Sequence, residues 1–375
     1  MTAAGRALDS GSRARLELAA ADGLARSGTV RTPRGGFSTP CFMPVGTRGA
    51  VRTASALDLE QLGAEIALAN TYHLMLRPGA ETVAALGGLH RFAAWGGHLL
   101  TDSGGYQVFS LGPSVDDDGV TFKSVYDGSR QRLTPEGAVA AQELIGADIQ
   151  MALDVCPGLP AEPAVLRQAV ERTVGWAERA RRAHHREDQA IFGIVQGGTD
   201  PALRAECAAR IAALDFDGYG IGGLSVGEGR DERLAALATT VAGLPADRPR
   251  YLMGVGDPVS VLEAVALGVD MFDCVLPTRL ARHGTALTSA GRLSVKGAAL
   301  ARDEGPVDPS CPCPVCGRFS RAYLRHLFTV AEPTAPRLLT LHNLAWILGL
   351  LARARAAIAD GSLACLRAET AAVWP

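Results

Sequence analysis

The 375-residue sequence predicts an α/β protein whose parallel strands close into a (β/α)₈ barrel. First, eight short apolar runs each end on a polar residue or a glycine, which is typical of strands buried on both faces. Second, stretches of roughly 20 to 45 residues with helical periodicity separate most of these runs. Third, the chain is long enough for a barrel of about 250 residues with insertions. Because such barrels place their chemistry at the carboxyl ends of the strands, we expect the functional site there.

The predicted strands follow one another along the chain, and each leaves its last residue at the mouth of the barrel. In order they are TPCFMPVG ending at Gly46, IALAN at Asn70, HLLTD at Asp102, IQMALD at Asp154, IFGIVQ at Gln196, YGIGG at Gly223, RYLMG at Gly254 and VDMFD at Asp273. An N-terminal β-hairpin is expected before the barrel. Residues 1–13 are expected to form a flexible tail, and residues 14–375 a single catalytic domain.

The composition is that of an ordinary soluble globular protein, 47% hydrophobic and 20% charged. No run approaches about 18 uninterrupted apolar residues, so no transmembrane helix is expected. The N-terminus lacks the apolar core of a signal peptide, and we therefore expect a cytoplasmic enzyme. The net charge of −2 attracts no nucleic acid by itself, but segment 274–326 holds eight basic and three acidic residues. A local basic face suits a polyanion, although solvated surface arginines would give the same pattern.

A cluster of cysteines predicts a structural metal site. Cys311, Cys313 and Cys316 place three thiols within six residues, and His342 follows in TLHNLAWIL. Three thiolates and one imidazole form a closed tetrahedral set, which is typical of structural Zn²⁺. We expect one zinc ion with a folding role, in a subdomain at about residues 300–345 near the C-terminal end. A redox cysteine cluster and unliganded cysteines remain alternatives.

Two of the strand-end carboxylates predict chemistry at a sugar carbon. Asp102 precedes Ser103-Gly104-Gly105, where glycines let the backbone approach a ligand, and Asp273 precedes an arginine-bearing loop. In such a pair one carboxylate attacks the anomeric carbon and the other handles the proton of the leaving group. The alternatives are that Asp102 caps a helix and that Asp273 pairs with Arg279 or Arg282.

A third strand-end carboxylate predicts a pocket for the edge of a purine. Asp154 can accept two adjacent N–H bonds, as a guanine-type edge offers, and Gln196 supplies both a donor and an acceptor. Gly222 and Gly223 expose further backbone N–H groups. Simple hydrogen bonding at strand ends is the alternative.

These motifs together resemble the tRNA-guanine transglycosylases over nearly the whole chain. In the family order, the sequence contains FSTPCFMPVGT, NTYHL, TDSGGYQVFSL, FKSVYDGS, MALDVC, IVQGG, IGGLSVGE, YLMGVGDP, MFDCVLPTR and the Cys₃His cluster. The resemblance implies an irregular (β/α)₈ TIM barrel with a zinc-binding subdomain near its C-terminal end. It also implies a pentosyltransferase of queuosine biosynthesis, which exchanges guanine-34 at the wobble position of GUN tRNAs for preQ1 (7-aminomethyl-7-deazaguanine).

The resemblance implies a role for each matching residue. Asp273 is expected to attack the ribose C1′ and form a covalent intermediate, with Asp102 as general acid and base. Asn70 and Gln107 are expected to orient Asp102. The base pocket is expected to use Ser103, Gly104, Gly105, Tyr106, Asp154, Cys156, Gln196, Gly223, Leu224 and Met253. Because the nucleoside bond is broken and remade on one face of the sugar, retention and ping-pong kinetics should follow.

The resemblance also implies two loops that contact an anticodon loop of UGU-type sequence. The first comprises Gly254, Val255, Gly256, Asp257, Pro258, Val259 and Ser260, and the second Thr278, Arg279, Leu280, Ala281 and Arg282. Leu280 and His283 stand where bacterial members commonly carry asparagine, and Asp257 brings a negative charge into a loop expected to approach RNA. Cys156 and Val226 resemble the bacterial pocket for preQ1 rather than the pocket for queuine.

The expected partners are tRNA, preQ1 and a second copy of the chain, with no membrane. The homodimer is expected to form through the zinc subdomain near Phe319 and Tyr323, which share a predicted helical face with Leu324 and Leu327. Two other function classes compete with this interpretation. A non-catalytic RNA-binding subunit should lack one of the two catalytic aspartates, and a barrel glycoside hydrolase would not explain the purine-edge residues or the zinc cluster.

Overall fold

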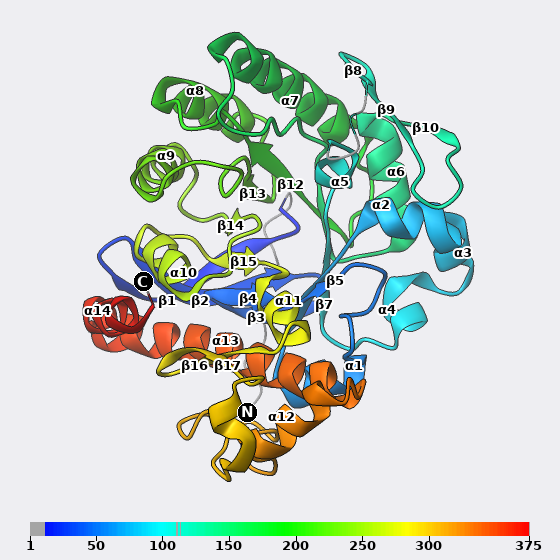
Figure 1. Ribbon diagram of the computed structural model, residues 1–375. Helices are drawn as coiled ribbons and strands as arrows, with labels where there is room; N and C mark the ends of the chain where they lie inside the picture. The colour runs from blue at the N-terminus through cyan, green and yellow to red at the C-terminus, as the bar shows by residue number, and fades with distance from the viewer. Residues whose placement is uncertain (1–11, 110–111, 113, 375) are drawn as a thin grey trace, which may run out of the picture.

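The computed structural model describes residues 12–109, 112 and 114–374, which form a barrel with additions at both ends (Figure 1). Residues 1–11 of the predicted tail lie outside the described residues. Ser12 and Arg13 are held by the fold, because the Ser12 hydroxyl and the Arg13 N–H donate to Asp217 Oδ1 at 3.2 and 2.6 Å.

The central sheet is the closed parallel barrel that the sequence predicts. Its strands pair in the order β4-β15-β14-β13-β12-β11-β7-β6-β5. They are β4 (Cys41–Met43), β5 (Val45–Gly46), β6 (Ile66–Ala69), β7 (His98–Thr101), β11 (Ile149–Met151), β12 (Ala190–Val195), β13 (Gly218–Ile221), β14 (Arg250–Leu252) and β15 (Met271–Asp273). The two ends of this order, β4 and β5, come from one apolar run that Pro44 divides, so the sheet closes on itself.

Helices connect the strands and cover the outside of the barrel (Figure 1). They are α1 (Ala56–Gln61), α2 (Thr71–Leu74), η1 (Met75–Gly79), α3 (Ala80–Ala85), α4 (Gly88–Ala93), α5 (Gly105–Phe109), α6 (Pro135–Ile145), α7 (Pro163–Ala183), α8 (Pro201–Ala212), α9 (Arg230–Ala242), α10 (Pro258–Ala266) and α11 (Leu276–Arg282). Three of them begin with a polar cap followed by proline: Thr134, Asp200 and Asp257 each accept an N–H bond from the first turn. This arrangement satisfies free N–H groups and presets the helical φ angle.

A three-stranded antiparallel sheet closes the amino-terminal end of the barrel. It consists of β1 (Arg15–Asp22), β2 (Ala25–Thr32) and β3 (Gly35–Thr39), one strand more than the predicted hairpin. Val30 and Phe37 are fully buried in one cluster with Ile149 and Met271, the first residues of their barrel strands. A substrate can therefore enter only from the opposite end.

A second antiparallel sheet is inserted between α5 and α6. Its strands are β8 (Ser114–Asp116), β9 (Gly119–Lys123) and β10 (Arg130–Leu133). Val120 and Phe122 of β9 are buried against Tyr72 and Trp176. The β9–β10 turn reaches α2, where the Tyr72 hydroxyl accepts the Val125 N–H at 3.2 Å.

The C-terminal elements are β16 (Thr285–Thr288), β17 (Gly291–Ser294), η2 (Ala298–Arg302), α12 (Arg321–Thr329), α13 (Thr334–Asp360) and α14 (Leu363–Val373). By length and composition alone α13 could cross a membrane, yet 61% of its most apolar stretch is buried inside the protein, as in a core helix. It packs against α11, β1 and β16. Its buried face joins the barrel to the cysteine cluster.

Candidate active site and metal centre

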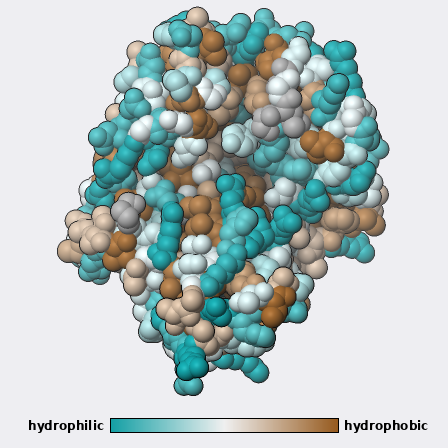
Figure 2. Space-filling model, viewed as in Figure 1, coloured by the Kyte–Doolittle hydropathy of each residue, from teal (hydrophilic) through white to brown (hydrophobic). Residues whose placement is uncertain are grey.

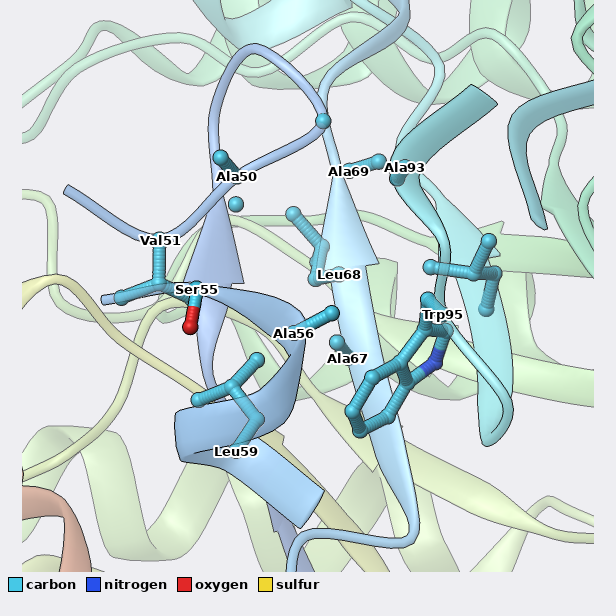
Figure 3. Close-up of a pocket in the computed structure, with 13 residues that line it drawn as sticks. Ala50, Val51, Ser55, Ala56, Leu59, Ala67, Leu68, Ala69, Ala93 and Trp95 are labelled. Atoms are coloured by element: carbon cyan, nitrogen blue, oxygen red, sulfur yellow. The ribbon is translucent and has the colours of Figure 1, made fainter. Parts of the chain in front are cut away.

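The main cavity lies at the carboxyl ends of the strands, where the sequence analysis expects the site. It has a volume of about 530 Å³ and is lined by Asp102, Asp154 and Asp273 together. Figure 2 shows a hollow at the centre of this face, bordered by hydrophilic side chains. A separate apolar cavity between β5, β6 and α1 measures only about 30 Å³. Val51, Leu59 and Trp95 are among the residues that line it (Figure 3). That space is about the volume of one water molecule, so the second cavity holds no substrate.

The predicted base-pocket residues meet in the main cavity, with one exception. Those that line it are Asn70, Ser103, Gly104, Tyr106, Gln107, Asp154, Cys156, Gln196, Gly223, Leu224 and Met253. Gly105 does not line the cavity. It is buried and donates its N–H to Ser103 Oγ at 3.2 Å, so it shapes the loop behind the pocket. The Tyr106 side chain is 62% exposed, which leaves its ring free to stack on a ligand.

Asp102 is held by donors from two loops. Its Oδ1 accepts the N–H of Thr71 at 3.0 Å and of Gly104 at 3.1 Å. Its Oδ2 accepts Asn70 Nδ2 at 2.5 Å and Gln107 Nε2 at 3.5 Å, as the sequence analysis expects for these two amides. Burial raises the pKa of Asp102 to about 7, against these hydrogen bonds and with a further rise from the charge of Asp273. At neutral pH this carboxyl can therefore both donate and accept a proton.

Asp273 has one bonded and one open carboxylate oxygen. Its Oδ1 accepts the Tyr251 hydroxyl at 2.6 Å and the Gly254 N–H at 2.8 Å. Among the described residues no donor bonds its Oδ2, and neither arginine of the following helix pairs with it. Burial raises the pKa of Asp273, and the two hydrogen bonds oppose that rise. Tyr251 therefore holds Asp273 in place, a role that the sequence does not predict for this tyrosine.

Asp154 and Gln196 form the floor of the predicted purine pocket. Gln196 Nε2 donates to Asp154 Oδ2 at 2.6 Å, and burial raises the pKa of Asp154 to about 6. The Gln196 Oε1 atom is buried with no hydrogen-bond partner among the described residues. A Cβ atom at Gly222 would lie 2.6 Å from Gln196 Nε2, so a side chain there would displace the Gln196 amide. The pair offers a carboxylate and an unsatisfied amide oxygen to the N–H groups of a ligand.

Arg204 supports this pocket from beneath and was not expected from the sequence. Its side chain is fully buried on α8. It donates to the carbonyls of Gly198 at 2.7 Å, Val195 at 3.2 Å and Gly223 at 3.2 Å. Burial lowers the pKa of Arg204 only to about 10, so the group stays charged at neutral pH. One planar guanidinium therefore fixes both glycine loops of the pocket.

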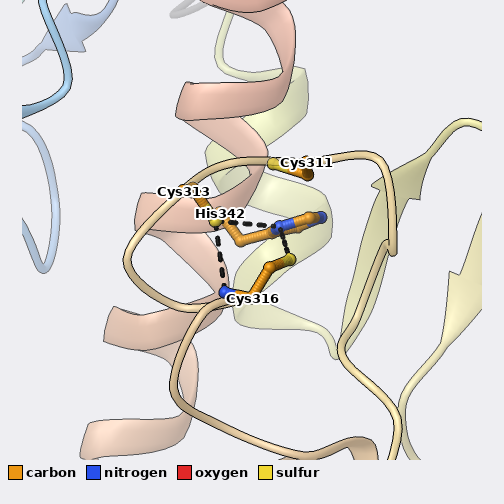
Figure 4. Close-up of side chains that lie close together, drawn as sticks. All are labelled: Cys311, Cys313, Cys316 and His342. Atoms are coloured by element: carbon orange, nitrogen blue, oxygen red, sulfur yellow. Dashed lines mark hydrogen bonds between the residues drawn. The ribbon is translucent and has the colours of Figure 1, made fainter.

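The four predicted metal ligands converge beside α13 (Figure 4). The ligand atoms of Cys311, Cys313, Cys316 and His342 all lie within 4.8 Å of one another. His342 Nδ1 lies 3.5 Å from Cys313 Sγ and 3.3 Å from Cys316 Sγ. Tetrahedral Zn²⁺ with bonds of roughly 2.3 Å to sulfur and 2.05 Å to nitrogen would set this separation at about 3.6 Å. The donor set and spacing fit a metal ion of this kind.

The second nitrogen of His342 orients its ring for metal binding. His342 Nε2 lies 2.8 Å from the Leu287 carbonyl, a partner that leaves Nδ1 free to face the thiols. Cys313 is buried in one cluster with Ala281 of α11, Ala286 of β16 and Leu339 of α13. The cluster therefore links α11, which follows Asp273, to the C-terminal helices.

The predicted helical face beside the metal site is partly buried in the protein and partly exposed to solvent. Leu324 and Leu327 are buried in the protein. Phe319 precedes α12 and stacks on Tyr323, with ring centroids 5.5 Å apart and an interplanar angle of 17°. Tyr323 is 43% exposed, so this aromatic pair stays at the surface.

The predicted RNA-contacting loops lie at the cavity rim, but several of their side chains face inward. Gly254, Val255, Gly256, Asp257 and Arg279 line the cavity. Pro258, Ser260, Thr278 and Ala281 of these loops are buried. Pro258 and Ser260 belong to α10, and Thr278 and Ala281 belong to α11. Val259, Leu280 and Arg282 are partly buried.

The negative charge of Asp257 has a local structural role. Its Oδ1 accepts the Ser260 N–H at 2.9 Å as the N-cap of α10. A carboxylate at this position also interacts favourably with the helix dipole. The charge that seemed out of place in the sequence therefore stabilises the loop on which Gly254 lies.

Comparison with known proteins agrees with this site. The family described as queuine tRNA-ribosyltransferase matches residues 22–375. A queuine tRNA-ribosyltransferase of Herpetosiphon aurantiacus is 54% identical over 339 residues, covering 90% of this chain and 86% of that protein. A protein of the same description from Moorella thermoacetica is 54% identical, and the match covers 90% of this chain and 91% of that protein. Another, from Solidesulfovibrio magneticus, is 50% identical, and the match covers 96% of this chain and 97% of that protein.

Proposed function

Because this chain belongs to the queuine tRNA-ribosyltransferase family and is a pentosyltransferase that acts on tRNA, we propose that it exchanges guanine-34 of GUN tRNAs for preQ1. The observation that carries this proposal is the pair of carboxylates at one cavity. Asp102 has a pKa of about 7 and four donors around it, whereas Asp273 keeps one oxygen open. The two environments suit a proton carrier and a nucleophile.

In the first half-reaction, the open oxygen of Asp273 bonds to the ribose C1′ of nucleotide 34 as the bond from C1′ to guanine breaks. Protonated Asp102 gives its proton to the departing guanine, which leaves as the neutral base. The hydrogen bonds from Tyr251 and Gly254 hold Asp273 and favour its ionised form. The product is a covalent ester between the enzyme and the ribose.

In the second half-reaction, the incoming preQ1 gives a ring proton to Asp102 and bonds to C1′, and Asp273 leaves as a carboxylate. Asp273 attacks C1′ from the face opposite the guanine, and preQ1 then attacks from the face opposite Asp273. Each displacement inverts C1′, so the overall configuration is retained. One glycosidic bond is broken and one is made, so no nucleotide cofactor is needed.

The purine edge is read by the polar floor of the cavity. Asp154 accepts N–H bonds from the guanine-type edge shared by both bases, and the buried Gln196 Oε1 accepts no bond from any described residue. Tyr106 and Met253 line the cavity and stack on the two faces of the ring. Cys156 and Val226 also line it, and they suit the small aminomethyl group of preQ1.

The RNA enters with nucleotide 34 turned out of its stack, since the carboxylates lie inside the cavity. Gly254 and Arg279 at the rim contact the flanking nucleotides of a UGU-type loop.

The Cys₃His cluster holds one Zn²⁺ per chain with a folding role. Tyr323 is exposed and stacks on the partly buried Phe319, and a homodimer forms through the zinc subdomain at this pair. The enzyme works in the cytoplasm.

Exchange of radiolabelled guanine into unmodified tRNA tests this proposal. We expect the wild type to incorporate label, and added preQ1 to displace it. Asp273→Asn should still bind tRNA but incorporate no label, because an amide oxygen is a poor nucleophile. A non-catalytic RNA-binding subunit would bind tRNA without incorporation. A glycoside hydrolase would release guanine without taking up the labelled base, so either result would contradict the proposal.

A further inference from the structure

A cluster of cationic and aromatic side chains lies at the rim of the cavity, outside the site described so far. The Arg77 guanidinium carbon lies 4.7 Å from the centre of the Tyr126 ring, and the Arg48 guanidinium carbon lies 5.6 Å from it. The Tyr126 hydroxyl lies 2.9 Å from His73 Nδ1. The four residues come from the β5–α1 loop, α2, η1 and the β9–β10 turn, so the fold brings distant segments together here (Figure 1).

The two guanidinium groups carry charge that the protein does not neutralise. Their carbons are no more than 10.3 Å apart, since both lie over one ring. Within the described residues, no carboxylate forms an ion pair with Arg48 or Arg77, and both side chains are exposed. Arg132 of the neighbouring insertion differs in this respect, since it pairs with Asp116 at 2.7 Å. Unpaired guanidinium groups held this close together form a binding site for an anion.

The cluster is coupled to the catalytic cavity through His73. That residue lines the cavity, and its N–H donates to Asn70 Oδ1 at 3.0 Å, while Asn70 Nδ2 holds Asp102. On its other side His73 lines a groove of about 780 Å³, together with Arg48, Arg52 and Arg337. Burial lowers the pKa of His73, and the charge of Arg48 adds to this effect, so the imidazole is neutral at pH 7. A chain that leaves the cavity past His73 therefore meets Arg48 in this groove, and Arg77 lies over the same Tyr126 ring as Arg48.

We propose that Arg48 and Arg77 bind backbone phosphates of the tRNA beside the exchanged nucleotide, and that Tyr126 is the residue that positions both guanidinium groups. This inference rests on the proposed function, which supplies RNA as the substrate. A guanidinium group matches the geometry of a phosphate, and contacts of this kind fix the register of a nucleic acid without reading its sequence. An aromatic ring that holds both cations reduces the conformational entropy lost when the phosphates bind.

The test is the salt dependence of binding to a tRNA anticodon stem-loop. Each neutralised phosphate contributes about 0.7 to the slope of log Kd against log salt for single strands. The double variant Arg48→Gln/Arg77→Gln should lower that slope by about 1.4 and weaken binding roughly tenfold at physiological salt. The KM for tRNA should rise while the KM for free guanine stays at the wild-type value. Arg367→Gln is the matched control, because Arg367 is exposed on α14 and forms no ion pair within the part of the chain that the structure describes. In Figure 1, α14 lies on the opposite side of the molecule from α2 and the β9–β10 turn.

Variants of Tyr126 test its positioning role separately. Tyr126→Phe keeps the ring and should keep the wild-type salt slope, whereas Tyr126→Leu should weaken tRNA binding several-fold. A wild-type slope in the double arginine variant would overturn the inference. So would a changed sedimentation coefficient of that variant, since the arginines would then bind a second copy of the chain. Wild-type enzyme that neither exchanges guanine nor binds the stem-loop would refute the proposed function itself.

Discussion

The substitution Asp102→Asn tests the electrostatics of the cavity without any substrate. Burial raises the pKa of this carboxyl from an ordinary 3.8 to about 7. Between these two pH values the folded protein keeps a proton that the unfolded chain has released. Raising the pH therefore destabilises the folded state by about 1.4 kcal/mol per pH unit, until the pH passes the folded pKa.

The size of the effect follows from the pH window. From pH 5.5 to pH 8.5 the ionisation of Asp102 should remove about 2 kcal/mol from the free energy of unfolding, of which about 1.6 kcal/mol is lost by pH 7. Asparagine does not titrate, and its oxygen can still accept the Thr71 and Gly104 N–H bonds. The stability of the variant relative to wild type should therefore rise by about 2 kcal/mol between pH 5.5 and 8.5.

Urea unfolding at the two pH values, with zinc present, measures this difference. Any unfavourable contact of the new amide with Asn70 is independent of pH and cancels in the comparison. Asp127→Asn is the control, since Asp127 is exposed and hydrogen bonds from Ser124 and Ser129 lower its pKa, so it stays ionised throughout. A variant whose relative stability is equal at both pH values would refute the assignment of a raised pKa to Asp102.

Three further substitutions test other parts of the site. Cys313→Ser should lower the metal content from about one ion per chain to near zero by elemental analysis and lower the melting temperature, whereas the exposed Cys365→Ser should change neither. Tyr251→Phe removes a hydrogen bond that lowers the pKa of Asp273, so the acid limb of the kcat/KM pH profile should move up by about 1 to 2 units. An unmoved limb would show that the hydroxyl does not act on the nucleophile. Arg204→Lys cannot span all three carbonyls, so the KM for free guanine should rise roughly tenfold; an unchanged KM would contradict its role in the pocket.

The strands could be predicted from the sequence because their signal is local. Each run of buried residues is continuous, and its polar end marks where the strand leaves the core, as Asp102 and Asp273 do. The metal ligands were predictable for a similar reason, because three cysteines within one short loop need only one partner. The structure brings His342 to them from α13.

The missed features depend on contacts between distant segments. Tyr251 lies in a predicted strand, β14. Its hydrogen bond to Asp273 depends on the register in which β14 pairs with β15, which the sequence pattern does not reveal. Arg204 has the sequence pattern of a surface residue on a helix, and only the glycine loops packed above α8 bury it. Thr278 and Ala281 fall in a predicted RNA loop, yet α13 packs against their helix and buries them.

The central claim is that Asp273 bonds covalently to the ribose of the tRNA. Mixing the enzyme with tRNA in the absence of preQ1, denaturing the mixture rapidly and digesting it should yield an RNA-linked peptide. Mass spectrometry should place the nucleotide on the peptide that contains Asp273, and the adduct should vanish when preQ1 is added before denaturation. A nucleotide on any other residue, or exchange without a covalent adduct, would contradict the account.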